Sequence, residues 1–109
     1  MVAPARIVTL TTDFGTDDPF VGEMKGAILT VDPSLRIVDL THAVPPHDIV
    51  AGACLLDIGS RAFPPGTVHV AVVDPGVGTG RRAVAVESED AFWVGPDNGV
   101  LARALRGRR

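Results

Sequence analysis

Short runs rich in β-branched residues alternate along this chain with segments whose apolar residues recur at helical spacing. The strand-like runs cover 7–12 (IVTLTT), 37–40 (IVDL) and 68–73 (VHVAVV), and each is apolar enough to be buried on both faces. Buried strands that alternate with helices are typical of a parallel sheet with right-handed crossover connections. This alternation is the strongest constraint that the sequence sets on the fold.

The first connecting segment predicts a helix. Asp18 followed by Pro19 is a typical helix start, and apolar residues recur at helical spacing as far as Leu29. Gly22 and Gly26 lie one turn apart, at a cost of about 1 kcal/mol each relative to alanine. We therefore expect this helix to approach a sheet or a ligand closely.

The second half of the chain continues the pattern. Asp48 is expected to cap a second helix, which ends before the break at 63–66 (FPPG). Residues 83–87 and 91–94 predict a hairpin, and 98–105 predict a final helix. The predicted fold class is α/β, a mainly parallel sheet flanked by helices.

Composition excludes several classes of protein. The chain has 109 residues, a length typical of one small domain, and no apolar run approaches the roughly 18 residues of a membrane-spanning helix. Four of the ten basic residues lie in 103–109, so residues 1–102, with six basic and 13 acidic residues, carry a net charge of −7. An acidic body with 5% aromatic residues argues against a nucleic-acid partner. No signal peptide is recognisable at the N-terminus, so we expect a cytoplasmic protein without a membrane partner.

The single cysteine, Cys54, lies in an apolar helical segment, so we expect its thiol to be buried and inert.

Polar residues follow the predicted strands, where parallel sheets bind their ligands. Asp13 follows the first strand, and its two carboxylate oxygens suit the vicinal hydroxyls of a ribose. A simple Asx turn into the helix is the alternative interpretation. Asp74 follows the third strand and precedes Arg81 and Arg82, which fits either a structural salt bridge or a catalytic pair.

Two common kinds of site find little support. The glycine-rich stretch 74–82 (DPGVGTGRR) has neither the GxxxxGK[ST] nor the GxGxxG pattern of phosphate-binding loops. His42, His47 and His69 lack cysteine or carboxylate neighbours at the spacing of metal ligands. We therefore expect no metal site, although Mg²⁺ held by the strand-end carboxylates for phosphoryl transfer stays open as an alternative.

Taken together, TTDFG, THAVPPHD, DPGVGTGRR and VGPDNGVL resemble the S-adenosylmethionine hydroxide adenosyltransferase family, whose relatives include the fluorinating and chlorinating adenosyltransferases. The resemblance covers nearly the whole chain. It implies attack by water or hydroxide on the 5′ carbon of S-adenosylmethionine, which gives adenosine and methionine without a cofactor or a metal. It also implies a homotrimer for the full-length protein.

The resemblance assigns roles to particular residues. Asp74 and Arg81 match the catalytic Asp and Arg of the family, with Arg82 as the alternative for the Arg. An ionised Asp74 repels a halide by a few kcal/mol and so favours water as the nucleophile. The substrate-binding positions that the resemblance implies include the ribose-binding Asp13, His47 near the nucleoside and Asn98 in the GPDNG turn; the complete set is Asp13, Phe14, His47, Val77 and Asn98.

Two features of the family have no counterpart in 1–109. Its catalytic histidine and its C-terminal β-barrel domain would both lie after Arg109. Residues 1–109 are therefore expected to form the N-terminal α/β domain alone, a truncated form of the enzyme. The alternative function is a nucleoside-binding or oligomerisation module without turnover.

Overall fold

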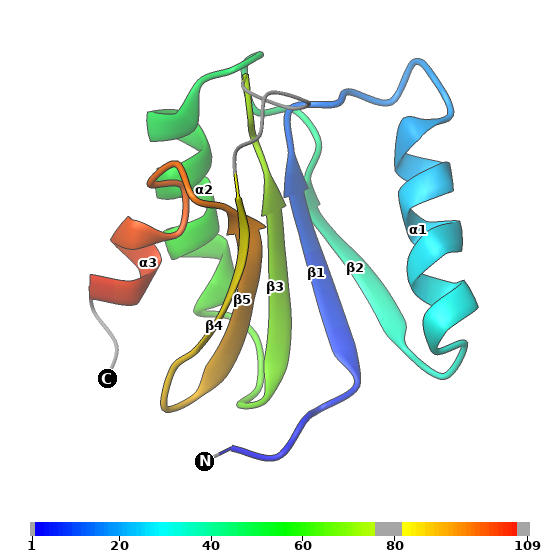
Figure 1. Ribbon diagram of the computed structural model, residues 1–109, viewed down its shortest axis with the longest axis vertical. Helices are drawn as coiled ribbons and strands as arrows, with labels where there is room; N and C mark the ends of the chain where they lie inside the picture. The colour runs from blue at the N-terminus through cyan, green and yellow to red at the C-terminus, as the bar shows by residue number, and fades with distance from the viewer. Residues whose placement is uncertain (1, 76–81, 107–109) are drawn as a thin grey trace.

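A mixed five-stranded sheet forms the centre of the computed structural model, which describes residues 2–75 and 82–106 (Figure 1). The strand order is β2-β1-β3-β5-β4. The strands are β1 (Ile7–Thr12), β2 (Arg36–Thr41), β3 (Thr67–Val72), β4 (Ala83–Glu87) and β5 (Ala91–Pro96). The helices are α1 (Phe20–Val31), α2 (Ile49–Ser60) and α3 (Ala102–Arg106).

The direction of the strands confirms the predicted α/β fold. β1 pairs in parallel with both β2 and β3, and β3 pairs in parallel with β5. β4 and β5 form the predicted antiparallel hairpin. The chain moves from β1 outward to β2 through α1 and then returns through α2 to β3 on the other side of β1. Such a reversal between β1 and β3 is a topological switch point, the place where open α/β sheets bind ligands.

The core lies between the sheet and the α2–α3 side. Trp93 on β5 is fully buried there, and its ring lies 4.7 Å from that of His69 on β3. Thr9 Oγ1 lies 2.7 Å from His69 Nδ1, and the indole N–H of Trp93 donates to Ser88 Oγ at 2.9 Å. Each of these four polar atoms thus has a hydrogen-bond partner, which keeps the free-energy cost of burying it low.

Helix α1 differs from expectation. It has no buried residue, and Figure 1 shows it at the β2 end of the sheet, apart from α2 and α3. A Cβ added to Gly22 or Gly26 would meet no atom of the described residues within 4 Å, so the predicted close approach of the sheet to these glycines is wrong. A close approach to a ligand stays a prediction. Large apolar side chains of α1 stay exposed instead, including Phe20 and Val31.

The ends of the helices can be compared with the residues predicted to begin and end them. Asp48 caps α2 as predicted, because its carboxylate accepts a hydrogen bond from the Ala51 N–H at 2.9 Å. At α1 the N-cap residue is Pro19, and the Asp18 carboxylate accepts from the Phe20 N–H at 3.0 Å. The last helix is shorter than 98–105, because 98–101 form a turn before α3 begins.

Two further expectations concern exposure. Cys54 is half-buried, so the expected burial of its thiol is only partial. Within the described residues, every helix is too short or too polar to cross a membrane.

Candidate active site

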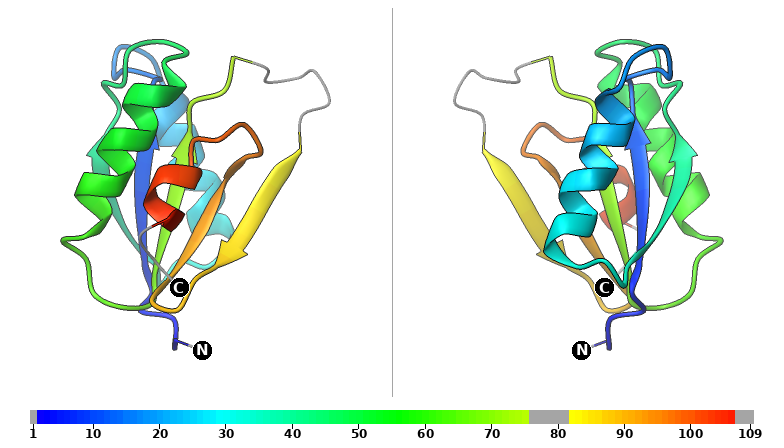
Figure 2. Two further views of the ribbon diagram at one scale, coloured as in Figure 1. Left: turned by 90° about the vertical axis from the view of Figure 1, so that its left-hand side faces the viewer. Right: turned by 90° about the vertical axis from the view of Figure 1, so that its right-hand side faces the viewer.

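The two predicted acids follow neighbouring strands. Thr12, the last residue of β1, pairs with Val72, the last residue of β3. Asp13 and Asp74 come one and two residues later, so both lie at the carboxyl edge of the sheet, beside the switch point. Figure 2 shows this edge, where the loops after β1 and β2 lie, opposite the segment that leads into β1.

Asp13 joins the β1 loop to the segment before α2. Its Oδ2 accepts a hydrogen bond from the His47 N–H at 2.7 Å, across 34 residues of sequence. His47 itself has a φ of 62°, a left-handed conformation that few non-glycine residues adopt. The contact is long-range, so the Asx-turn interpretation of Asp13 does not describe it. A half-buried carboxylate with one oxygen held in this way can present the other oxygen to a ligand hydroxyl.

Phe14 contributes an aromatic surface beside Asp13. Its N–H donates to Thr12 Oγ1 at 3.2 Å, which closes the turn after β1. Its ring packs edge-on against Phe20, with centroids 6.4 Å apart. Phe20 is 56% exposed, so this aromatic pair borders solvent.

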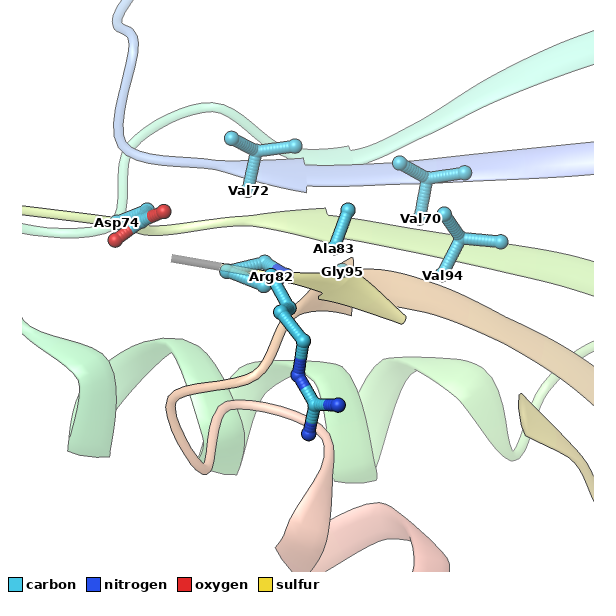
Figure 3. A pocket seen from close by; sticks show the side chains of 8 residues that line it. Val70, Val72, Asp74, Arg82, Ala83, Val94 and Gly95 are labelled. Carbon is cyan, nitrogen blue, oxygen red and sulfur yellow. The ribbon is translucent and has the colours of Figure 1, made fainter. Parts of the chain in front are cut away.

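Asp74 lies at one end of an apolar pocket on the sheet face that α2 does not cover (Figure 3). The pocket has a volume of about 210 Å³, and Val70, Val72 and Val94 form much of its wall. The Asp74 side chain is half-buried. An apolar pocket with one carboxylate at its end can hold a water molecule beside an uncharged or cationic ligand.

Of the two arginines that follow Asp74 in the sequence, the structure describes Arg82. Arg81 and Val77 lie outside the described residues. The guanidinium of Arg82 pairs with Asp97 at 3.1 Å, and Figure 3 shows it directed away from the Asp74 carboxylate. The choice between Arg81 and Arg82 as the catalytic Arg stays a prediction.

Asn98 supports the backbone next to Asp74. Its Nδ2 donates to the Val73 carbonyl at 2.8 Å, and its Oδ1 accepts from the Val100 N–H at 3.1 Å. The amide therefore links the turn after β5 to the residue that precedes Asp74. A direct contact of Asn98 with substrate stays a prediction.

One group of residues was missed by sequence reasoning. His42, which the sequence suggested only as an unsuitable metal ligand, is buried between Thr12 Oγ1 and Asp39 Oδ1, each 2.7 Å from one of its ring nitrogens. Burial opposes the ionisation of Asp39, but hydrogen bonds from Lys25 and His42 outweigh it and hold the pKa of this carboxyl below its usual value. The three-residue spacing of Asp39 and His42 at the end of a strand is the only signal that could have indicated this group.

Metal-ligating side chains do not gather in the part of the chain that the structure describes. In residues 2–75 and 82–106, no group of three or more His, Cys, Asp or Glu side chains is arranged to hold an ion.

The fold and this edge define an α/β domain with two carboxylates beside the switch point of its sheet, where such domains bind ligands. Residues 8–109 match the SAM hydroxide adenosyltransferase N-terminal domain, and the chain belongs to that family. It is 47% identical to an (R)-S-adenosyl-L-methionine hydrolase of Salinispora tropica, over 99% of this chain and 42% of the relative. A hydrolase of the same name from Methanocaldococcus jannaschii is 44% identical, over 87% of this chain and 38% of the relative. A fluorinase of an Actinoplanes species is 36% identical, over 78% of this chain and 28% of the relative.

Solved structures agree with the fold. A conserved hypothetical protein from Thermus thermophilus matches with a TM-score of 0.84 and 43% identity, over 97% of this chain and 43% of that one. An uncharacterized conserved protein from Thermotoga maritima matches with a TM-score of 0.87 and 40% identity, over 94% of this chain and 40% of that one. The chain thus spans about two-fifths of the length of these two proteins and of the hydrolases.

Proposed function

We propose that the natural protein containing this domain hydrolyses S-adenosylmethionine to adenosine and methionine. The observation that carries the proposal is the position of Asp13 and Asp74 after two adjacent parallel strands, on either side of the switch point. Membership in the SAM hydroxide adenosyltransferase family and the names of the hydrolase relatives support the same reaction.

The chemistry makes modest demands on the protein. The 5′ carbon of S-adenosylmethionine is attached to a positively charged sulfonium, and methionine leaves as a neutral thioether that needs no proton. Catalysis then consists of orienting one water molecule and removing its proton as the new C–O bond forms. In our proposal Asp74 does this at the end of the apolar pocket that Val70, Val72 and Val94 line.

The other residues hold the substrate. Asp13 accepts hydrogen bonds from the ribose hydroxyls through the oxygen that His47 N–H does not occupy. Phe14 and His47 border the nucleoside, and Asn98 holds the main chain beside Asp74. Arg81 assists Asp74, and Val77 contacts the substrate; both roles come from the resemblance and lie outside the described residues.

The wider biology of the protein is part of the proposal. S-adenosylmethionine is the substrate, and we propose that no cofactor takes part. A homotrimer, a cytoplasmic location and the absence of nucleic-acid and membrane partners complete the proposal; the resemblance supports the trimer, and the charge and hydropathy of the chain support the rest.

Isotope labelling tests the reaction. The full natural chain is incubated with S-adenosylmethionine in H₂¹⁸O, and the adenosine is examined by mass spectrometry. We expect one ¹⁸O atom in the 5′ hydroxyl of adenosine, together with free methionine. The Asp74→Asn variant, which keeps the side-chain volume but is a far weaker base, should form adenosine about 10² to 10⁴ times more slowly.

Three results would contradict the proposal. Formation of a 5′-halogenated adenosine, dependent on added halide, would refute water as the nucleophile. Binding of adenosine without turnover would favour the nucleoside-binding module instead. Loss of activity on chelation of divalent ions would favour the metal-dependent alternative.

A further inference from the structure

A continuous chain of hydrogen bonds runs from α1 to the end of β1. Lys25 Nζ donates to Asp39 Oδ2 at 2.9 Å, and Asp39 Oδ1 lies 2.7 Å from His42 Nε2. On the other side of the ring, His42 Nδ1 lies 2.7 Å from Thr12 Oγ1, which also accepts the Phe14 N–H at 3.2 Å. This series of hydrogen bonds ends at Thr12, next to Asp13, which is predicted to bind the ribose.

For a neutral His42, the chemistry of the partners sets the direction of each bond. Asp39 is ionised at neutral pH and can only accept, so the proton on Nε2 of His42 points to it. In the neutral imidazole Nδ1 is then an acceptor, and the hydroxyl of Thr12 donates to it. The oxygen of that hydroxyl still accepts the Phe14 N–H, so in this state the hydroxyl and both ring nitrogens have partners.

The same residues tie two loops together. The Gly15 N–H donates to the His42 carbonyl at 2.8 Å, and the Val44 N–H donates to the Thr12 carbonyl at 3.3 Å. With the His47 bond to Asp13 and the Thr12–His42 contact, four hydrogen bonds join residues 12–15 to residues 42–47. The position of the Asp13 carboxylate therefore depends on the His42 segment.

The two inner residues, Thr12 and His42, are buried. Thr12 is fully buried and His42 is 7% exposed, and the Thr12 hydroxyl and both ring nitrogens of His42 already have partners within the protein. At the other end of this series of hydrogen bonds, the side chains of Asp39 and Lys25 are partly exposed to solvent. The arrangement suits positioning of the β1 loop rather than chemistry.

We propose that His42 is a positioning residue: Asp39 orients its ring, and the ring holds the Thr12 hydroxyl and thereby the loop that carries the Asp13 carboxylate. The effect on ligand affinity rests on the proposed function of Asp13 as the ribose ligand. The effect on the loop itself does not.

Matched variants of Thr12 test the hydroxyl on the full natural chain. Thr12→Ser keeps the hydroxyl, whereas Thr12→Val keeps the shape and removes it. We expect Thr12→Val to bind adenosine about tenfold more weakly by calorimetry, equivalent to about 1.4 kcal/mol, and Thr12→Ser to stay within twofold of wild type. Equal affinity of the two variants would overturn the proposal.

Two substitutions of His42 separate its two contacts. The amide of His42→Asn lies near the Nδ1 position and can still accept from Thr12, whereas the amide of His42→Gln reaches the Nε2 position and Asp39. The proposal expects His42→Asn to keep adenosine affinity within about threefold and His42→Gln to lose about tenfold. The reverse order would contradict it.

Nuclear magnetic resonance supplies readouts that need no ligand. In ¹⁵N-histidine-labelled wild type at pH 7, His42 should carry its proton on Nε2 and have an unprotonated Nδ1. The amide resonances of Phe14 and His47 should shift in Thr12→Val and stay in place in Thr12→Ser. If wild type binds no adenosine, the proposed ribose role of Asp13 fails, and these shifts alone decide the positioning proposal. An Nδ1–H tautomer, or unmoved amides in Thr12→Val, would refute it; the tautomer is read on wild type and so decides even where a variant does not fold.

Discussion

Replacement of Asn98 tests how the backbone beside Asp74 is held. The side chain makes two hydrogen bonds to main-chain groups, as a donor to the Val73 carbonyl at 2.8 Å and as an acceptor from the Val100 N–H at 3.1 Å. Asn98→Ala removes both bonds. Asn98→Asp keeps the acceptor and replaces the donor with a carboxylate oxygen that faces the Val73 carbonyl.

The expected magnitude follows from these two contacts. Each hydrogen bond contributes about 1 kcal/mol net, so Asn98→Ala should lower the free energy of unfolding of the domain by about 2 kcal/mol. At pH 7 Asn98→Asp should cost at least as much, because two oxygens then face each other. Protonation of the introduced carboxylate restores a donor, which raises the pKa of this group in the folded state, so the deficit of Asn98→Asp should shrink as the pH falls toward about 4.

The fluorescence of Trp93 is a suitable assay. Trp93 is the single tryptophan of the 109 residues and is fully buried in the sheet, so its emission should shift to longer wavelength when this domain unfolds. Urea titrations at pH 7 and pH 4.5 would give the free energies. A cost below about 0.5 kcal/mol for Asn98→Ala, or no pH dependence of Asn98→Asp relative to wild type, would refute the assigned bonds.

Three further predictions follow from other parts of the structure. Lys25 and His42 hold the pKa of Asp39 below its usual value, so the stabilisation from Asp39 is present above about pH 4 and is lost as the pH falls further. In urea titrations Asp39→Asn should therefore gain stability relative to wild type below about pH 4. A difference that stays constant with pH would contradict this. Gly66 and Gly99 have φ values of 91° and 92°, but of these two positions only Gly66 has neighbouring backbone that an added Cβ would overlap. Gly66→Ala should therefore lower the free energy of unfolding by about 2 kcal/mol more than its control Gly99→Ala in the same assay. Equal losses of stability would refute the overlap. In steady-state kinetics with S-adenosylmethionine, Asp74→Asn should lower kcat by about 10² to 10⁴ with little change in KM, and an unchanged kcat would exclude Asp74 as the base.

The sheet was largely predictable, because its strands have a local signature. β-branched runs and turn residues located all five strands, with ends that differ by at most two residues from those observed. The position of Asp13 and Asp74 at one edge followed as well, since parallel strands with crossover helices bring their carboxyl ends together. These inferences need only local pattern and a general rule of topology.

What the sequence did not predict depends on long-range contacts. The apolar stripe and glycines of α1 suggested tight packing, but periodicity does not say whether a partner surface is present, and α1 buries no residue among those described. Val73, which accepts from Asn98, and Thr12, which contacts His42, lie 25 and 30 residues away along the chain, so spacing gave no sign of these two contacts. The pairing of Arg82 with Asp97 was hidden for the same reason.

The structure of the full natural chain with adenosine bound tests the central claim most directly. We predict that the ribose hydroxyls lie within hydrogen-bond distance of the Asp13 carboxylate and that the 5′ carbon faces Asp74, across the gap between the ends of β1 and β3. Adenosine bound with its ribose away from Asp13, or with its 5′ carbon on the far side of the sheet from Asp74, would contradict the account.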